Sequence, residues 1–348
     1  MLEPIWERDR GAAPEISVLM PVYRTPEFVG DAIGSVLDQT GNVLEVLISD
    51  DSSGDATLER ALAVAQSYDG PHAIRVFRTR RRLAIDHLGA LVAEARAGFM
   101  VEAHGDDLSL PGRMAALHTA HRQSGAALVT SEAELTEDEA APGDILPGLQ
   151  PDSAVLMRRQ GVFQGARYGF HRVIYDAFPP LTGAYLPRGH DVVQAFRAQL
   201  TGGVHVLGER LLTRRQHAGQ WSRSGRSWDA RMPPARRFGH ALNRLGIVAV
   251  MRSDLDHLEA TRGPHERAAS LRGLIDAEER AMLGVLVGAR RELRAHGFEP
   301  QWRSLDAIER GNQSTLRWPP SDEPRPPAPP PPLARRSLNR LLRLIGRS

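Results

Sequence analysis

Short apolar runs alternate with helical segments over residues 15–130, and this alternation limits the fold more than any other feature. The sequence predicts buried strands separated by helices whose apolar residues recur at three- and four-residue spacing. The predicted strands span residues 16–22, 43–49, 74–77, 99–103 and 127–130. Such alternation is typical of a largely parallel sheet with helices on both faces. We therefore predict an α/β fold of three layers, α/β/α.

Acidic residues stand where several of these elements meet. The run 43–49 is followed by Asp50-Asp51, and the run 99–103 is followed by His104-Gly105-Asp106-Asp107. A third acidic position, Asp191, begins a later helical pattern. In open α/β sheets, ligands bind in the crevice at the carboxyl ends of the strands. Carboxylates gathered there can hold a divalent cation, a ribose or a reacting hydroxyl.

The residue types that are missing exclude several classes of chemistry. The chain has 348 residues, enough for one large core with an appendage or for two small domains. It contains no cysteine, so disulfides, thiolate metal sites and cysteine nucleophiles are excluded. All 44 basic residues are arginine, which also excludes lysine Schiff bases and any lysine-dependent phosphate loop.

The net charge of +2 is unevenly distributed along the chain. Five arginines and no acid lie in the last fifteen residues, and subtracting these five leaves −3 for the rest of the chain. A mildly acidic body does not indicate nucleic-acid binding. The tail places four apolar residues on one helical face and its arginines largely on another. This pattern predicts either a helix on an anionic membrane surface or an unstructured basic tail.

Changes in composition suggest the boundaries of the domains. Residues 131–190 are rich in proline, glycine and acid with weak periodicity, which is typical of a functional or flexible loop. Two long helices are predicted at 235–261 and 266–296. The predicted organisation is an N-terminal lead (1–14), the α/β domain (15–227), a helical extension (228–317), a proline-rich linker (318–332) and the basic tail (333–348).

The sequence indicates neither a signal peptide nor a membrane-spanning segment. The first residues lack a sufficient apolar stretch, and the longest apolar runs fall far short of the roughly 20 residues of a membrane-spanning helix. We therefore expect a cytoplasmic protein, or one that is peripheral at the inner membrane face.

A series of motifs follows a fixed order over residues 15–222. The series is Ile16-Ser17-Val18-Leu19-Met20-Pro21-Val22-Tyr23, Ser35-Val36-Leu37-Asp38-Gln39-Thr40, Asp50-Asp51-Ser52-Ser53-Gly54-Asp55, Asp106-Asp107 with Pro111-Gly112-Arg113, Asp191-Val192-Val193 and Arg214-Arg215-Gln216-His217. Each motif alone is weak, but together they make the chain resemble a family 2 glycosyltransferase. The resemblance implies the Rossmann-like GT-A fold of nucleotide-diphospho-sugar transferases. It also implies an inverting, metal-dependent enzyme that moves a sugar from a nucleoside-diphosphate sugar to an acceptor.

The resemblance implies a metal site for Mn²⁺ or Mg²⁺. Asp106 matches the final acid of the family's Asp-x-Asp motif and would bind the metal, with His217 closing the site. Asp107 would support the site or contact the ribose of the donor. The motif's first acid is replaced by His104, which could bind a ribose hydroxyl or the metal. An oxygen and imidazole ligand set would suit Mn²⁺ somewhat better than Mg²⁺.

The resemblance also places the donor nucleotide at the ends of the first two strands. Asp51 would accept a hydrogen bond from the base, with Asp50 beside it, while Pro21 and Tyr23 would shape the base pocket. The alternative for the two acids is a solvated turn that caps the following helix.

By the same resemblance, Asp191 is the general base that deprotonates the acceptor hydroxyl. The acid that precedes it in the family is His190 here. The alternative for Asp191 is a helix cap. The two departures, at His104 and His190, leave open a catalytically silent relative that only binds nucleotide sugars.

The expected partners are the sugar donor and a glycan, lipid-linked or small-molecule acceptor, in a setting of cell-surface polysaccharide synthesis. A homo-oligomer is left open. A sugar-phosphate nucleotidyltransferase ranks below these hypotheses, because it needs a glycine-rich loop after the first strand and commonly a lysine. The chain has Pro21-Val22-Tyr23-Arg24 at that place and no lysine.

Overall fold

A computed structural model describes residues 2–135, 165–181, 189–215, 217 and 233–295. The chain divides into two compact units, which are described separately. The first unit comprises residues 1–152, 159–176 and 201–225, and the second comprises residues 153–158, 177–200 and 226–348.

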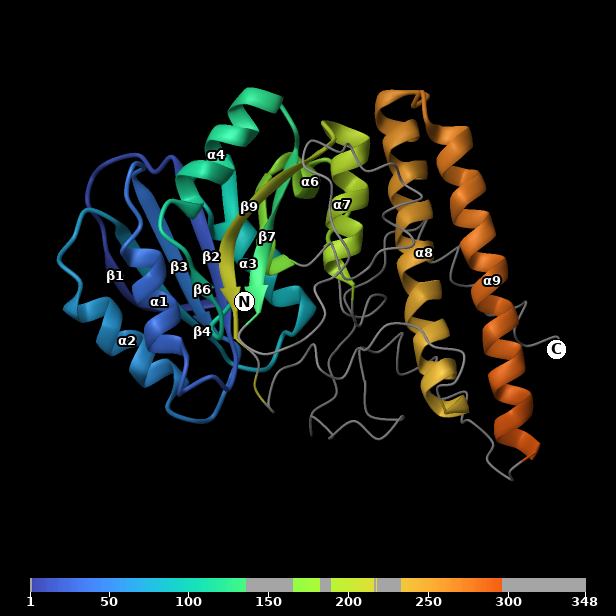
Figure 1. Cartoon of the computed structure of the whole chain (residues 1–348), viewed down its shortest axis with the longest axis horizontal. Helices are drawn as coiled ribbons and strands as arrows, with labels where there is room; N and C mark the ends of the chain where they lie inside the picture. Colours follow the sequence, from blue (N-terminus) through green and yellow to red (C-terminus); the bar gives the residue numbers. More distant parts are fainter. Residues whose placement is uncertain (1, 136–164, 182–188, 216, 218–232, 296–348) are drawn as a thin grey trace. The chain divides into compact units, whose positions relative to one another are not determined.

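The first unit is built on a nine-stranded sheet with the order β1-β4-β3-β2-β5-β8-β7-β9-β6 (Figure 1). Its strands are β1 (Leu2–Arg8), β2 (Ile16–Val22), β3 (Leu44–Asp50), β4 (Ala73–Thr79), β5 (Phe99–Glu102), β6 (Leu108–Ser109), β7 (Leu128–Leu135), β8 (Tyr168–His171) and β9 (Val204–Arg214). The central strands β4, β3, β2 and β5 run parallel to one another, and β7 runs parallel to β9. The pairs that involve β1, β8 and β6 are antiparallel. The predicted α/β class is confirmed, with a sheet that is more mixed than the sequence suggested.

Helices cover both faces of this sheet. They are α1 (Val29–Leu37), α2 (Thr57–Ser67), α3 (Ile85–Glu94), α4 (Arg113–Ser124) and the short α6 (Val173–Asp176), with the 3₁₀ turn η1 (Gly165–Arg167) before β8. Alternate residues of β2 and β3 pack with α1, α2 and α4 in one apolar cluster. Ser49 of β3 follows Ile48, a member of this cluster, so its side chain points to the opposite face of the sheet. There His87 of α3 hydrogen-bonds it (Nε2 to Oγ, 2.7 Å). α3 therefore covers the face opposite α1.

Strand β1 lies within the predicted N-terminal lead, residues 1–14. It pairs antiparallel with β4 and forms the sheet edge, with a register shift between Pro4 and Trp6. Arg78 of β4 binds Glu3 at 3.1 Å. Because β1 is only half-buried and interrupted by proline, it lacks the apolar run by which the buried strands were recognised.

The stretch 131–190 was predicted as irregular, but it contains regular elements where the structure describes it. β7 continues to Leu135, and β8 lies between β5 and β7 in the sheet. β8 has only four residues, Tyr168–His171, one of them glycine. A phenylalanine ring, that of Phe99, lies where a Cβ at Gly169 would stand, so the glycine permits this close packing.

The second unit contains three described helices: α7 (His190–Thr201), α8 (Pro234–Arg262) and α9 (Ala268–Ala295). All three were predicted, and α8 and α9 form an antiparallel pair (Figure 1). Apolar residues of α8 around Leu245 pack against Leu286 and Ala289 of α9. The division groups α7 with the C-terminal helices, whereas the sequence analysis grouped it with residues 15–227. Where the domain boundary lies stays a prediction.

Two predicted segments lie outside the described residues, namely the linker 318–332 and the tail 333–348. Among the helices of the described ranges, none combines the length and the apolar character needed to cross a membrane.

Candidate active site

The carboxyl ends of three parallel strands lie at one edge of the sheet. Val22 at the end of β2 pairs with Asp50 at the end of β3, and β5 ends at Glu102, opposite Leu19 of β2. The chain turns sharply after the strands, since Arg24 and Ser52 adopt φ angles of 52° and 58°. Non-glycine residues adopt this left-handed region rarely, and they cluster at functional sites.

Asp50 builds the turn at the end of β3. Its carboxylate accepts a hydrogen bond from the backbone N–H of Ser53 at 3.0 Å and another from the Ser53 hydroxyl. That hydroxyl also accepts the backbone N–H of Arg24 at 2.9 Å. Asp50 is therefore a buried link between two loops of the site, and it is not the solvated turn residue of the alternative interpretation.

Asp51 is also buried, and it organises the loop that follows β4. One carboxylate oxygen accepts the N–H of Leu83 at 2.6 Å, and the other accepts the N–H of Ala84 at 2.8 Å. The hydroxyl of Thr79 lies 3.2 Å from the first oxygen. Each carboxylate oxygen has two lone-pair directions, so this arrangement leaves room for one further donor.

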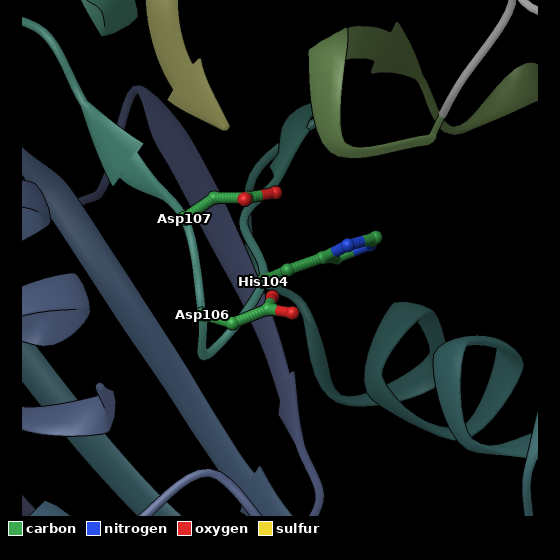
Figure 2. Close-up of side chains that lie close together, drawn as sticks. All are labelled: His104, Asp106 and Asp107. Carbon is green, nitrogen blue, oxygen red and sulfur yellow. The ribbon is translucent and has the colours of Figure 1, made fainter. Parts of the chain in front are cut away.

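Three potential metal ligands follow β5. One ligand atom from each of His104, Asp106 and Asp107 lies within 4.8 Å of the other two. Figure 2 shows the three side chains extending to the same side of the turn. Gly105 permits this geometry, because a Cβ there would stand only 2.8 Å from a side-chain carbon of Val22.

The charged groups in and beside this turn shift one another's pKa values. Burial acts to lower the pKa of His104, but the hydrogen bond and the charge of Glu102 outweigh it. Together with the two aspartates, they raise the pKa of His104 to about 9. Burial first, and then the charge of Asp106, raise the pKa of Asp107 to about 6. The His104 side chain is 35% exposed, so solvent still reaches the ring.

The chain just beyond β9 closes the cluster. The backbone N–H of Arg215 donates to Asp107 at 3.2 Å, and its Nε donates to the carbonyl of Asp106 at 2.6 Å. The ring of His217 lies 3.1 Å from the Asp106 carboxylate and 4.5 Å, between centroids, from the ring of Phe28. The two predicted metal ligands, Asp106 and His217, therefore lie together.

The predicted base pocket has an aromatic and cationic character. The guanidinium groups of Arg82 and Arg24 lie 4.3 Å and 5.2 Å from the centre of the Tyr23 ring. Pro21 is half-buried and stands opposite Ser49 in the β2–β3 register. The residues assigned to the donor from the sequence thus lie at the ends of neighbouring strands.

Residues 17–143 match the model of the family described as glycosyl transferase family 2. Over these residues the chain is similar to family 2 glycosyltransferases. The putative glycosyltransferase EpsE of Bacillus subtilis (strain 168) is 31% identical over 103 residues, which are 30% of this chain and 37% of EpsE. The uncharacterized protein MT1568 of Mycobacterium tuberculosis (strain CDC 1551 / Oshkosh) is 32% identical over 107 residues, which are 30% of this chain and 32% of that protein. The chain thus spans about a third of the length of these relatives.

A solved structure supports the fold over a longer stretch than the family match. The crystal structure of S. aureus TarS 1-349 in complex with UDP-GlcNAc superposes with a TM-score of 0.52 and 14% identity. The similarity covers 85% of this chain and 88% of the TarS chain. At this identity the likeness concerns the fold alone, and it confirms the GT-A architecture that the sequence predicted.

The predicted general base, Asp191, belongs to the second unit. It lies in the first turn of α7, and one of its carboxylate oxygens accepts the N–H of Val192 at 2.9 Å. The other predicted site residues belong to the first unit, and the structure brings them to the carboxyl ends of its strands. The role of Asp191 stays a prediction.

Sequence reasoning missed two residues of the candidate site. Glu102 is 1% exposed and hydrogen-bonds His104 at 2.9 Å, and Arg215 connects the two acids of the turn. Glu102 could have been noticed as a carboxylate inside an otherwise apolar strand, since buried acids are normally paired. Nothing in the sequence distinguishes Arg215 from the neighbouring arginine.

The donor atoms of the cluster fit a divalent cation. Two carboxylates and an imidazole suit borderline and hard ions such as Mn²⁺ and Mg²⁺, which prefer oxygen with some nitrogen. A second imidazole, that of His217, stands against one of the carboxylates.

Proposed function

We propose that this protein transfers a sugar from a nucleoside-diphosphate sugar to an acceptor hydroxyl, with inversion at the anomeric carbon and with a divalent cation. The observation that carries the proposal is the convergence of His104, Asp106 and Asp107 after β5, within 4.8 Å of one another. This cluster stands at the carboxyl ends of parallel strands in a family 2 domain, where ligands of open α/β sheets bind.

Asp106 and Asp107 would hold the cation, with His217 adjacent. When bound, such an ion supplies Lewis-acid stabilisation to the negative charge of a departing nucleoside diphosphate. Arg215 fixes the turn through its N–H to Asp107 and its Nε to the Asp106 carbonyl, so the two acids are held in place before any ligand arrives.

The nucleotide would lie between the ends of β2 and β3. The aromatic ring of Tyr23 would stack against the base. The two guanidinium groups near this ring, those of Arg24 and Arg82, would attract the phosphates. The carboxylate of Asp51 retains one lone-pair direction for a base N–H, and Pro21 and Asp50 shape the surrounding wall.

Replacing Asp106 with alanine tests the metal-dependent donor site. We expect donor hydrolysis in the presence of Mn²⁺ to fall at least about a hundredfold, because charge stabilisation of the leaving group is lost. Hydrolysis is measured as nucleoside diphosphate released from a panel of nucleotide sugars. The control is Asp69→Asn, which removes an exposed carboxylate elsewhere in the unit. Hydrolysis equal to that of the unmodified protein would reject the site.

Replacing Asp191 with asparagine tests the general base. We expect transfer to fall at least about a hundredfold while donor affinity is retained, since a base acts on the acceptor proton only. Donor affinity is measured by thermal shift, and transfer is measured as glycosylated product. Near-normal turnover would remove Asp191 from this role.

A catalytically silent, nucleotide-sugar-binding module is the second candidate. It is favoured by the histidines at positions 104 and 190, where the family has acids. The two candidates separate in one experiment, because a silent module binds the donor with Mn²⁺ present but releases no nucleoside diphosphate over hours.

We propose a glycan, lipid-linked or small-molecule acceptor in cell-surface polysaccharide synthesis at the cytoplasmic membrane face. The basic residues of 333–348 would hold the enzyme at an anionic lipid surface.

A further inference from the structure

Glu102 is buried and pairs with His104, and the proposed function assigns no role to this hydrogen bond. His104 Nε2 lies 2.9 Å from Glu102 Oε1. An ionised carboxylate only accepts hydrogen bonds, so Nε2 carries a proton in either charge state of the ring. The ring nitrogen left to bind a cation is therefore Nδ1.

The carboxylate is held firmly in place. Glu102 is 1% exposed, and the buried guanidinium of Arg113 donates to its backbone carbonyl at 2.8 Å. Gly165 packs so closely that a Cβ there would stand 2.5 Å from Oε1. A buried carboxylate confined in this way orients the imidazole to which it is bonded.

We propose that His104 is a metal ligand through Nδ1 and that Glu102 is its positioning residue. Metal-binding histidines commonly donate their second N–H to a carboxylate, which fixes the ring and raises its basicity. The same turn supplies Asp106 and Asp107 as oxygen ligands. An imidazole here selects Mn²⁺ over Mg²⁺, because nitrogen ligands suit the softer ion. This inference rests on the proposed metal-dependent function.

The test uses the full chain, stripped of metal by a chelator and then loaded with Mn²⁺ alone. Electron spin-echo modulation from ¹⁴N reports an imidazole bound to Mn²⁺, and loss of the free-ion signal reports affinity. We expect nitrogen modulation in the unmodified protein. Because His217 also lies against Asp106, the comparison is made in a His217→Asn background, where adding His104→Asp, which restores an acid, should leave Mn²⁺ binding without that modulation.

The positioning role of Glu102 is tested by Glu102→Gln. We expect Mn²⁺ affinity to fall about tenfold to a hundredfold, the range for residues that orient a ligand. Circular dichroism verifies that this buried substitution leaves the fold intact. The control His205→Ala removes a histidine on β9 and should change neither affinity nor modulation.

Several outcomes would overturn the inference. If modulation persists in His104→Asp and vanishes in His217→Asn, the nitrogen belongs to His217, and the proposed function stands without His104. If Glu102→Gln folds and binds Mn²⁺ with unchanged affinity, Glu102 has no positioning role. If the unmodified protein binds no Mn²⁺, both this inference and the metal dependence of the proposed function fail.

Discussion

Asp51 illustrates how one carboxylate can shape a loop far away in the sequence. It accepts the backbone N–H groups of Leu83 and Ala84, which follow it by more than thirty residues. Ala84 has a φ of 51°, a conformation that costs on the order of 1–3 kcal/mol and needs support from its surroundings. The charge-assisted hydrogen bonds from Asp51 supply that support.

Replacing Asp51 with asparagine should therefore destabilise the loop that follows β4. The new NH₂ group cannot accept an N–H, so one backbone donor of the loop loses its partner. We expect the free energy of unfolding to fall by about 1.5–3 kcal/mol, as for other hydrogen bonds to charged groups. Urea denaturation measures the loss, and Asp55→Asn, at an exposed turn carboxylate, serves as the control. Equal stability of the two variants would contradict the role.

For single residues, the sequence predicted that Asp51 and Asp106 follow the ends of strands but not what they bind. The strand-end position of Asp51 and Asp106 follows from periodicity, because parallel strands end at one edge. Their partners come from loops and from the end of β9, which no local pattern connects to them. The bond between Glu102 and His104 was missed for another reason, since the acid was counted within an apolar run.

Among the elements, the buried parallel strands were predictable and the antiparallel additions were not. β2 and β3 are continuous apolar runs because helices cover both of their faces. β1 and β8 depend on the edges that other strands offer them, and their own residues carry little signal. The helices α7, α8 and α9 were predictable because each has a long apolar periodicity.

An ion pair between α7 and α8 is the main polar contact described inside the second unit. Arg197 donates to both carboxylate oxygens of Asp254, at 2.7 Å and 2.9 Å, and the two side chains are 1% and 2% exposed. Arg197 also donates to the carbonyl of Pro179. Removing one member of such a pair leaves the opposite charge unpaired in the interior. This lowers the free energy of unfolding by more than the intact pair contributes to it.

We expect Asp254→Ala to lower the free energy of unfolding of this unit by about 3–5 kcal/mol. The double variant Arg197→Met with Asp254→Leu should lose less, because neither charge is then left buried. Denaturation followed by the helical circular dichroism signal measures both. The control Glu292→Ala removes the acid of an ion pair between α8 and α9, and this acid is more exposed than Asp254. It should lower the free energy of unfolding by less than about 1 kcal/mol. A double variant less stable than the single one would reject the argument.

Considered as a whole, the molecule separates its charges by position. The last fifteen residues carry five arginines, while the remainder has a net charge of −3. Each arginine near an anionic lipid surface contributes on the order of 1 kcal/mol, and this contribution decays within a Debye length. The acidic remainder is repelled by the same surface. Any membrane affinity should therefore depend on the tail and should weaken with salt.

Deleting residues 333–348 tests this expectation. We expect the full chain to sediment with phosphatidylserine vesicles at low salt and the shortened chain to remain in the supernatant. A variant with Leu338→Asn and Leu341→Asn keeps all five arginines, so its binding separates charge attraction from insertion of an apolar helical face. If this variant sediments with the vesicles at low salt but not in 0.5 M salt, charge attraction alone accounts for its binding. Equal sedimentation of the full and shortened chains would show that the tail does not hold this protein at a membrane.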